Sequence, residues 1–169
     1  MKFLGFVLVT VSSAVCGLCY CTGKSEHVND LRSFCLMLEI MQGEITDRLS
    51  PLPELAVSVS ERVQGRASNF LSVLSLNLNF LGEKDFDRIW CESLEACRPE
   101  LDEKELEAIA ALGKILGRYD VNTQSEAISV SLTYLRSKLN KESSELPQLK
   151  KLSLSVSMSA GALLAILLV

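Results

Sequence analysis

Both ends of this 169-residue chain are long segments without a charged side chain. The first runs from residue 3 to 23 and the second from residue 152 to 169, while every acidic residue lies between Glu26 and Glu145. At about 1.5 Å per residue, helices of roughly 20 and 18 residues cross, or nearly cross, a hydrocarbon core of about 30 Å. The pattern predicts two terminal transmembrane helices, residues 1–23 and 152–169, on either side of a polar central domain.

The N-terminal segment also has features of a secretory signal sequence, because Lys2 precedes an apolar stretch that ends in small residues. No clear cleavage site follows, and the apolar character continues through Leu18 and Tyr20. These features favour a retained membrane helix and leave a cleaved leader open.

Basic residues are distributed unevenly around the two apolar segments. Only Lys2 lies on the side of the chain ends, whereas seven basic residues flank the segments on the side of the central domain: Lys24, Arg32, Arg136, Lys138, Lys141, Lys150 and Lys151. Short loops rich in lysine and arginine stay on the cytoplasmic side of a membrane. The distribution predicts a two-pass protein with a cytoplasmic central domain.

The central domain, residues 24–141, shows helical periodicity and no sustained strand alternation. One apolar stripe consists of Leu31, Phe34, Leu38, Met41, Ile45 and Leu49, and a similar stripe consists of Ile128, Leu132, Leu135 and Leu139. Four further helices are expected between them, one of which begins with a capping box formed by Asp102 and Glu105. The predicted fold is an all-α bundle of about six helices, followed by a linker at residues 142–151.

A stretch with two glycines is predicted to join the fifth and sixth helices. Gly113 lies inside the fifth helix, where the missing side chain lets another helix approach, and Leu116 ends that helix. Gly117 occupies the position of a left-handed C-cap. Either Asp120 or Thr123 can cap the next helix, and Glu126 would complete a capping box with Thr123. Asp120 can also hydrogen-bond to Gln124 one turn later. The residues around the glycines match neither a Walker phosphate loop nor an apolar helix-dimerisation motif.

Residues of the types used in catalysis or metal binding are sparse or isolated. Cys16, Cys19 and Cys21 lack a second cluster that would complete a metal site. His27 is the sole histidine and is expected to be exposed in a linker. No nucleophile motif or phosphate loop is present, so we expect no enzyme activity, no cofactor and no metal.

The charge of the central part argues against nucleic acid as a partner, since residues 24–151 carry 16 basic and 21 acidic side chains. Ten acids and four bases lie between Glu83 and Glu107. Such a segment forms either a solvated helix face or an acidic surface for a basic partner.

Three segments resemble the stage III sporulation protein AB family of endospore-forming bacteria. They are LGKILGRYDVNTQSEAI at residues 112–128, LTYL at 132–135 and EITDRLSPLPE at 44–54. The apolar ends and the helical middle extend the resemblance over essentially the whole chain. The family commonly has Tyr-Gly in place of Asp47-Arg48, and a glycine-rich final segment where this chain has several serines.

The resemblance implies a non-enzymatic platform subunit of the sporulation channel complex, in the mother-cell membrane that faces the forespore. Its domain would be similar to the cytoplasmic domains of the platform protein of type II secretion and type IV pilus machines. The implied partners are the stage III sporulation protein AA ATPase and other channel subunits, with self-association left open. Two alternatives remain: a GPI-anchored helical protein cut near Ser143-Ser144, and a membrane-anchored adaptor without an ATPase partner.

The C-terminal apolar segment has small residues at every fourth position, namely Ser153, Ser157, Gly161 and Ala165. Such a face lets helix backbones approach closely in a membrane. The spacing therefore predicts assembly with other membrane helices.

Overall fold

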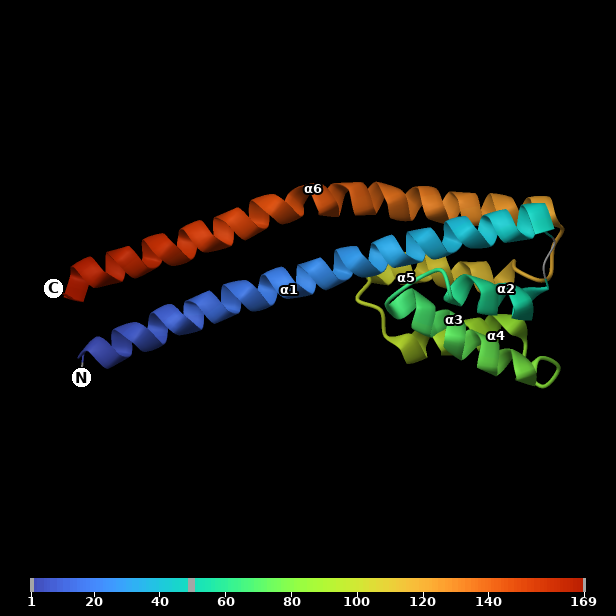
Figure 1. Ribbon diagram of the computed structural model, residues 1–169, viewed down its shortest axis with the longest axis horizontal. Helices are drawn as coiled ribbons and strands as arrows, with labels where there is room; N and C mark the ends of the chain where they lie inside the picture. The colour runs from blue at the N-terminus through green and yellow to red at the C-terminus, as the bar shows by residue number, and fades with distance from the viewer. Residues whose placement is uncertain (1, 49–50, 169) are drawn as a thin grey trace. The chain divides into compact units, whose positions relative to one another are not determined.

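The protein is all-helical throughout the part of the chain that a computed structural model describes: the backbone of residues 2–48 and 51–168, and the side chains of residues 22–47 and 51–147. No β-strand occurs among these residues, so the predicted all-α class is confirmed (Figure 1). The chain divides into two compact units. One comprises residues 27–139, and the other comprises Met1–Glu26 with Asn140–Val169.

Two long helices differ from the boundaries expected from the sequence. Helix α1 extends from Lys2 to Gly43 without the expected break after residue 23. No proline interrupts this range, and the backbone hydrogen-bond pattern does not depend on the change from apolar to polar side chains. Helix α6 extends from Val121 to Leu168 and includes Pro147, so the segment expected as a linker is helical. A proline inside a helix removes one backbone hydrogen bond, and here the helix continues through it.

Shorter helices connect α1 to α6. They are η1 (Glu44–Arg48, a π-helix), α2 (Leu52–Ser60), α3 (Arg66–Asn77), η2 (Leu78–Phe80), α4 (Phe86–Cys97), α5 (Glu103–Ala110) and η3 (Ala111–Lys114). The α-helix expected to reach Leu116 therefore ends at Ala110 and tightens into a 3₁₀ turn that contains Gly113. The predicted capping box at Asp102 and Glu105 is confirmed.

The core of residues 27–139 is built around a row of aromatic rings. Phe70 meets Trp90 edge-on, with ring centroids 4.8 Å apart and an interplanar angle of 83°. Phe34 lies on one side of Phe70 and Phe86 lies beside Trp90. Edge-to-face pairs stabilise a core by about 0.5–1.5 kcal/mol beyond the burial of their area. The row links α1, α3 and α4 in one apolar interior.

The two predicted stripes supply much of the remaining core. Leu31, Phe34, Leu38, Met41 and Ile45 are buried, and Leu49 lies outside the described residues. On α6, Ile128, Leu132 and Leu135 are buried as well. The side chain of Gln42 donates to Ser125, and Arg136 pairs with Glu39, so polar contacts hold α1 beside α6.

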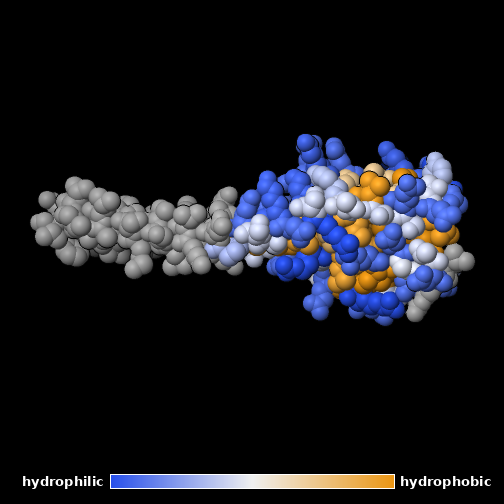
Figure 2. Space-filling model, turned by 90° about the horizontal axis from the view of Figure 1, so that it is seen from above, coloured by the Kyte–Doolittle hydropathy of each residue, from blue (hydrophilic) through white to orange (hydrophobic). Residues whose placement is uncertain are grey.

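The surface of residues 27–139 is mainly hydrophilic, with apolar patches on the face that Figure 2 draws. The large exposed apolar side chains are Leu36, Val57, Leu76, Phe80, Leu81, Tyr119 and Val130. Three of them lie in the short segments that precede α4 and α6: Phe80 ends η2, Leu81 follows it, and Tyr119 lies just before α6.

Candidate functional site

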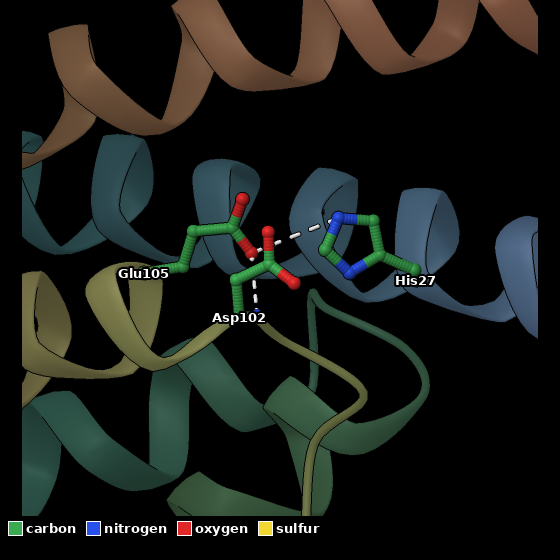
Figure 3. Close-up of side chains that lie close together, drawn as sticks. All are labelled: His27, Asp102 and Glu105. Carbon is green, nitrogen blue, oxygen red and sulfur yellow. Dashed lines mark hydrogen bonds and ion pairs between the residues drawn. The ribbon is translucent and has the colours of Figure 1, made fainter.

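Three ionisable side chains, His27, Asp102 and Glu105, converge at the start of α5. One possible ligand atom from each side chain, a ring nitrogen or a carboxylate oxygen, lies within 4.8 Å of the other two. Figure 3 shows the ring of His27, which comes from α1, facing the two carboxyl groups at the start of α5. Nε2 of His27 lies 3.7 Å from Oε2 of Glu105, and the two side chains are 12% and 0% exposed.

The capping box explains why the two carboxyl groups lie together. Asp102 is the N-cap residue of α5, and its backbone N–H donates to Oε2 of Glu105 at 2.9 Å. The Asp102 side chain in turn accepts from the backbone of Glu105. Such reciprocal bonds satisfy donors that the first turn of a helix leaves free. The proximity of the two carboxyl groups therefore follows from local contacts within one helical turn.

A second charged network fixes the turn that precedes α5. Oδ2 of Asp30, which is buried, accepts hydrogen bonds from Arg66 at 2.7 Å and from the backbone N–H of Glu100 at 2.8 Å. The carbonyl of Glu100 lies 2.7 Å from Nδ1 of His27. A carbonyl oxygen only accepts hydrogen bonds, so Nδ1 of His27 is the donor. Asp30 and His27, three residues apart on α1, therefore bind the backbone N–H and the backbone carbonyl of the same residue, Glu100.

The expectation of an exposed, isolated His27 in a linker is wrong. The histidine lies within a continuous helix, and its largely buried ring contacts residues more than 70 positions later in the chain. The capping box was visible as a local pattern, but nothing in the sequence connects His27 with it. Only the packing of α1 against the start of α5 brings the three groups together.

The thiols of residues 27–139 are not activated. Burial raises the pKa of Cys35 to about 11, with a further contribution from Glu39. Burial also raises the pKa of Cys97 to about 11, and it raises the pKa of Cys91, with Asp87 adding to the effect. Since the thiolate is the reactive form, these three cysteines are weak nucleophiles and weak metal ligands near neutral pH.

The glycine-containing joint lies between η3 and α6. Gly113 packs against Trp90 of α4, and Leu116 is buried. Gly117 has a φ of +77°, a conformation that favours glycine. The carboxylate of Asp120 accepts from the N–H and the hydroxyl of Thr123, and these bonds lower its pKa. Asp120 thus caps α6 by binding Thr123, and its side chain does not bind Gln124 as expected.

Gln124 instead closes the joint from inside α6. Its amide donates to the carbonyl of Tyr119 at 2.5 Å, and its carbonyl oxygen accepts from the N–H of Gly117 at 3.4 Å. The side chain thereby contacts both ends of the turn. The difference from the sequence prediction arises because Asp120 reaches the nearer donors of Thr123, which leaves the Gln124 amide for the backbone of the turn.

A groove of about 570 Å³ lies between α4 and α5. Its lining comprises apolar Cys91, Leu94, Pro99, Leu106 and Ala110, and charged Glu95, Arg98, Glu103 and Glu107. The three glutamates are exposed and belong to the acidic segment noted in the sequence. The groove therefore combines apolar side chains with an acidic border.

The structure does not describe the side chains of the candidate residues near the two ends of the chain. Ser153, Ser157, Gly161 and Ala165 belong to α6, and Cys16, Cys19 and Cys21 belong to α1, but their side chains lie outside the described residues. The same is true of Arg48 in the Asp47-Arg48 pair. Over the side chains that are described, no helix carries an apolar stretch of the length needed to span a membrane.

Together, the helical elements and the joint define a small α-helical domain. In its core, Gly113 has no side chain and lets Trp90 pack directly against the backbone. The chain belongs to the stage III sporulation protein AB family, because the sequence model of that family matches residues 2–169. Family membership implies a role related to sporulation. A search of curated proteins finds no match.

A solved structure of a stage III sporulation protein AB is similar to this fold. The TM-score is 0.64 at 22% sequence identity, and the alignment covers 72% of this chain and 96% of the other. At this identity the likeness concerns the fold alone.

Proposed function

We propose that this protein is a non-enzymatic platform subunit of the sporulation channel complex between mother cell and forespore. In this function it couples a cytoplasmic ATPase of the secretion type, the stage III sporulation protein AA ATPase, to the membrane assembly. Family membership and the uncharged segments at both ends of the chain support the proposal. The raised pKa values of the three described thiols also favour a binding function over covalent catalysis.

The groove between α4 and α5 is the observation that carries this function. The partly exposed side chains of Leu106 and Ala110 offer apolar contact, while Glu95, Glu103 and Glu107 place negative charge along the border. An amphipathic helix with basic flanks would bury apolar side chains there and pair with the glutamates. We therefore propose the groove as the surface that receives the ATPase or its immediate neighbour in the complex.

The proposed location is the mother-cell membrane that faces the forespore, with the central domain in the cytoplasm. The uneven distribution of lysine and arginine supports this orientation. The cytoplasmic side is also the compartment in which an ATPase partner has access to nucleotide.

Charge reversal at the groove tests the coupling. The full-length protein is co-purified with the ATPase from detergent-solubilised membranes, as wild type and as the triple variant Glu95→Lys/Glu103→Lys/Glu107→Lys. Loss of three favourable pairs, each of about 0.5–1 kcal/mol, together with new repulsion, is expected to reduce the recovered ATPase by at least about tenfold.

A matched triple variant, Glu54→Lys/Glu61→Lys/Glu126→Lys, changes the net charge equally at exposed acids outside the groove lining. It should retain the ATPase, and circular dichroism should show that both triple variants are folded. Equal loss in both triple variants would refute the groove as the docking surface. Failure of the wild-type protein to retain the ATPase would refute the coupling itself.

A further inference from the structure

We propose that His27, Asp102 and Glu105 form a binding site for a divalent transition-metal ion such as Zn²⁺. An imidazole nitrogen and two carboxylate oxygens lie within 4.8 Å of one another, and they come from two elements that are distant in sequence (Figure 3). A mixed nitrogen and oxygen set suits Zn²⁺ and related ions, whereas Ca²⁺ and Mg²⁺ prefer oxygen alone.

The orientation of the imidazole is the first argument. Because Nδ1 of His27 donates to the carbonyl of Glu100 at 2.7 Å, a neutral ring carries its lone pair on Nε2. Nε2 faces the carboxylate of Glu105 at 3.7 Å. A lone pair that faces a carboxylate is repelled by its negative charge, and a metal ion between the two groups would replace this repulsion with two favourable contacts. Metal-bound histidines commonly donate their other nitrogen to a backbone carbonyl in this way.

The unsatisfied oxygen of Glu105 is the second argument. Its side chain is 0% exposed, and Oε2 accepts from the N–H of Asp102. Oε1 is buried and has no hydrogen-bond partner among the residues that the structure describes. Buried carboxylate oxygens are normally bonded, because the loss of hydration is otherwise not compensated. A metal ion beside His27 that both oxygens of the Glu105 carboxylate bind would supply the missing interaction.

The spacing of the ligand atoms is the third argument. With metal–ligand distances of about 2.0–2.2 Å, two ligands of a tetrahedral ion lie roughly 3.4 Å apart. The observed pair of 3.7 Å is close to that separation, and all three ligand atoms lie within 4.8 Å of one another. Three protein ligands leave one position for water. The ion would tie α1 to the first turn of α5.

The test is Zn²⁺ titration of the untagged full-length protein by calorimetry, after treatment with a chelator. The protein carries Cys16→Ser, Cys19→Ser and Cys21→Ser, so that thiols near the N-terminus do not contribute. We expect one ion per chain with a dissociation constant of about 10 µM or tighter. Saturating Zn²⁺ should also raise the melting temperature by several degrees, since a ligand of the folded state stabilises it.

Conservative variants separate ligation from capping. Glu105→Gln and Asp102→Asn preserve a residue that can form the capping box or N-cap while they remove a carboxylate ligand. Each of these variants, and His27→Gln, should weaken Zn²⁺ binding at least about tenfold. Glu103→Gln is the matched control, because Glu103 is an exposed acid in the same helical turn, and it should bind like the parent.

Binding weaker than about 1 mM in the parent protein would overturn the site. Unchanged affinity in His27→Gln and Glu105→Gln would overturn it equally, because the ion would then be bound elsewhere. Neither result would affect the proposed coupling to the ATPase, which depends on the groove.

Discussion

Trp90 lies so close to Gly113 that a Cβ atom built on the glycine would come within 2.8 Å of Cδ1 and 2.9 Å of Cγ of the indole. Nonbonded carbon atoms pack at about 3.5–4.0 Å, so the indole occupies the space of the missing side chain. The indole N–H donates to the carbonyl of Ile109 at 3.0 Å, and Phe70 lies edge-on against the ring. Trp90 is therefore held from several sides and has little freedom to move away.

We expect Gly113→Ala to lower the free energy of unfolding by about 1–2 kcal/mol, and Gly113→Leu by about 3 kcal/mol or more. Either side chain must displace the indole and strain its bond to Ile109. Urea unfolding of the full-length protein in detergent, followed by circular dichroism, measures the change. Gly43→Ala is the control, because nothing lies within 4 Å of a Cβ at that position in α1. Equal midpoints for the wild-type and Gly113→Leu proteins would show that the contact is not formed in solution.

Gly117 is expected to tolerate other residues poorly for two separable reasons. Its φ of +77° costs an L-residue about 1–2 kcal/mol, and a Cβ there would lie 2.8 Å from Cδ1 of Leu52. Gly117→Ala should therefore lower the free energy of unfolding by about 1–2 kcal/mol or slightly more. Gly117→Asn should recover part of the backbone cost, since asparagine adopts this conformation more readily. Thermal melting of both variants checks the predicted ranking of stability, with wild type above Gly117→Asn and Gly117→Asn above Gly117→Ala. An alanine variant as stable as wild type would contradict the prediction.

The buried thiols predict a loss of stability in alkaline solution. An exposed cysteine loses its proton near pH 9, whereas the pKa values of Cys35 and Cys97 are about 11 in the folded protein. Between these values the unfolded state binds fewer protons than the folded state, so the free energy of unfolding falls as the pH rises. The fall is at most about 1.4 kcal/mol per pH unit for each thiol.

Urea unfolding at several pH values from about 8 to 11 measures this dependence. The control is Cys35→Ala/Cys97→Ala, which retains the titrating lysines and tyrosines but lacks the two thiols. Its stability should fall less steeply than that of the wild type. Identical slopes would show that the thiols titrate normally in the folded state.

The orientation of the central domain can be tested with a thiol reagent that does not cross membranes. Cys91 and Cys97 are partly buried and have raised pKa values, so they react slowly; Ser129→Cys adds a thiol at an exposed position of α6. We expect no labelling of this variant in intact cells and rapid labelling after permeabilisation. Labelling in intact cells would place the domain outside and contradict the positive-inside prediction.

The small-residue series near the C-terminus remains a prediction from the sequence. Ser157→Leu/Gly161→Leu keeps the segment apolar but fills the face that is expected to pack against other membrane helices. We expect normal insertion, weaker recovery of partner subunits and impaired sporulation. The control is Met158→Leu/Leu164→Met on the opposite face. Normal assembly of the double leucine variant would mean that the segment serves as an anchor only.

Local patterns in the sequence predicted the helical class and the starts of α5 and α6. The stripe from Leu31 to Ile45 marked a core face because helical spacing brings these side chains to one side. The capping box at Asp102 and Glu105 was readable because both partners lie in one turn. By contrast, the change in hydropathy near Gly23 did not end α1, since a helix stops where backbone bonding fails and not where side-chain polarity changes.

Long-range packing accounts for what the sequence did not predict. His27 and Glu105 are separated by more than 70 residues, and no local rule links a histidine to a distant capping box. Asp120 and Gln124 have a spacing that permits a side-chain bond, yet each found a nearer backbone or hydroxyl partner. The spacing of two residues along a helix shows which hydrogen-bond partners a side chain can reach. Which of these hydrogen bonds forms depends on the other donors and acceptors nearby.

The chain contains a single tryptophan, and that residue is Trp90. Its indole is 0% exposed in the aromatic row between α3 and α4, and the groove-lining residue Cys91 follows it directly in the sequence. Tryptophan fluorescence of this protein, excited selectively over the tyrosines, therefore arises from one buried site and needs no added dye. A shift of the emission to longer wavelength would report water entering the core, and a change in intensity at constant wavelength would report a partner seated beside α4.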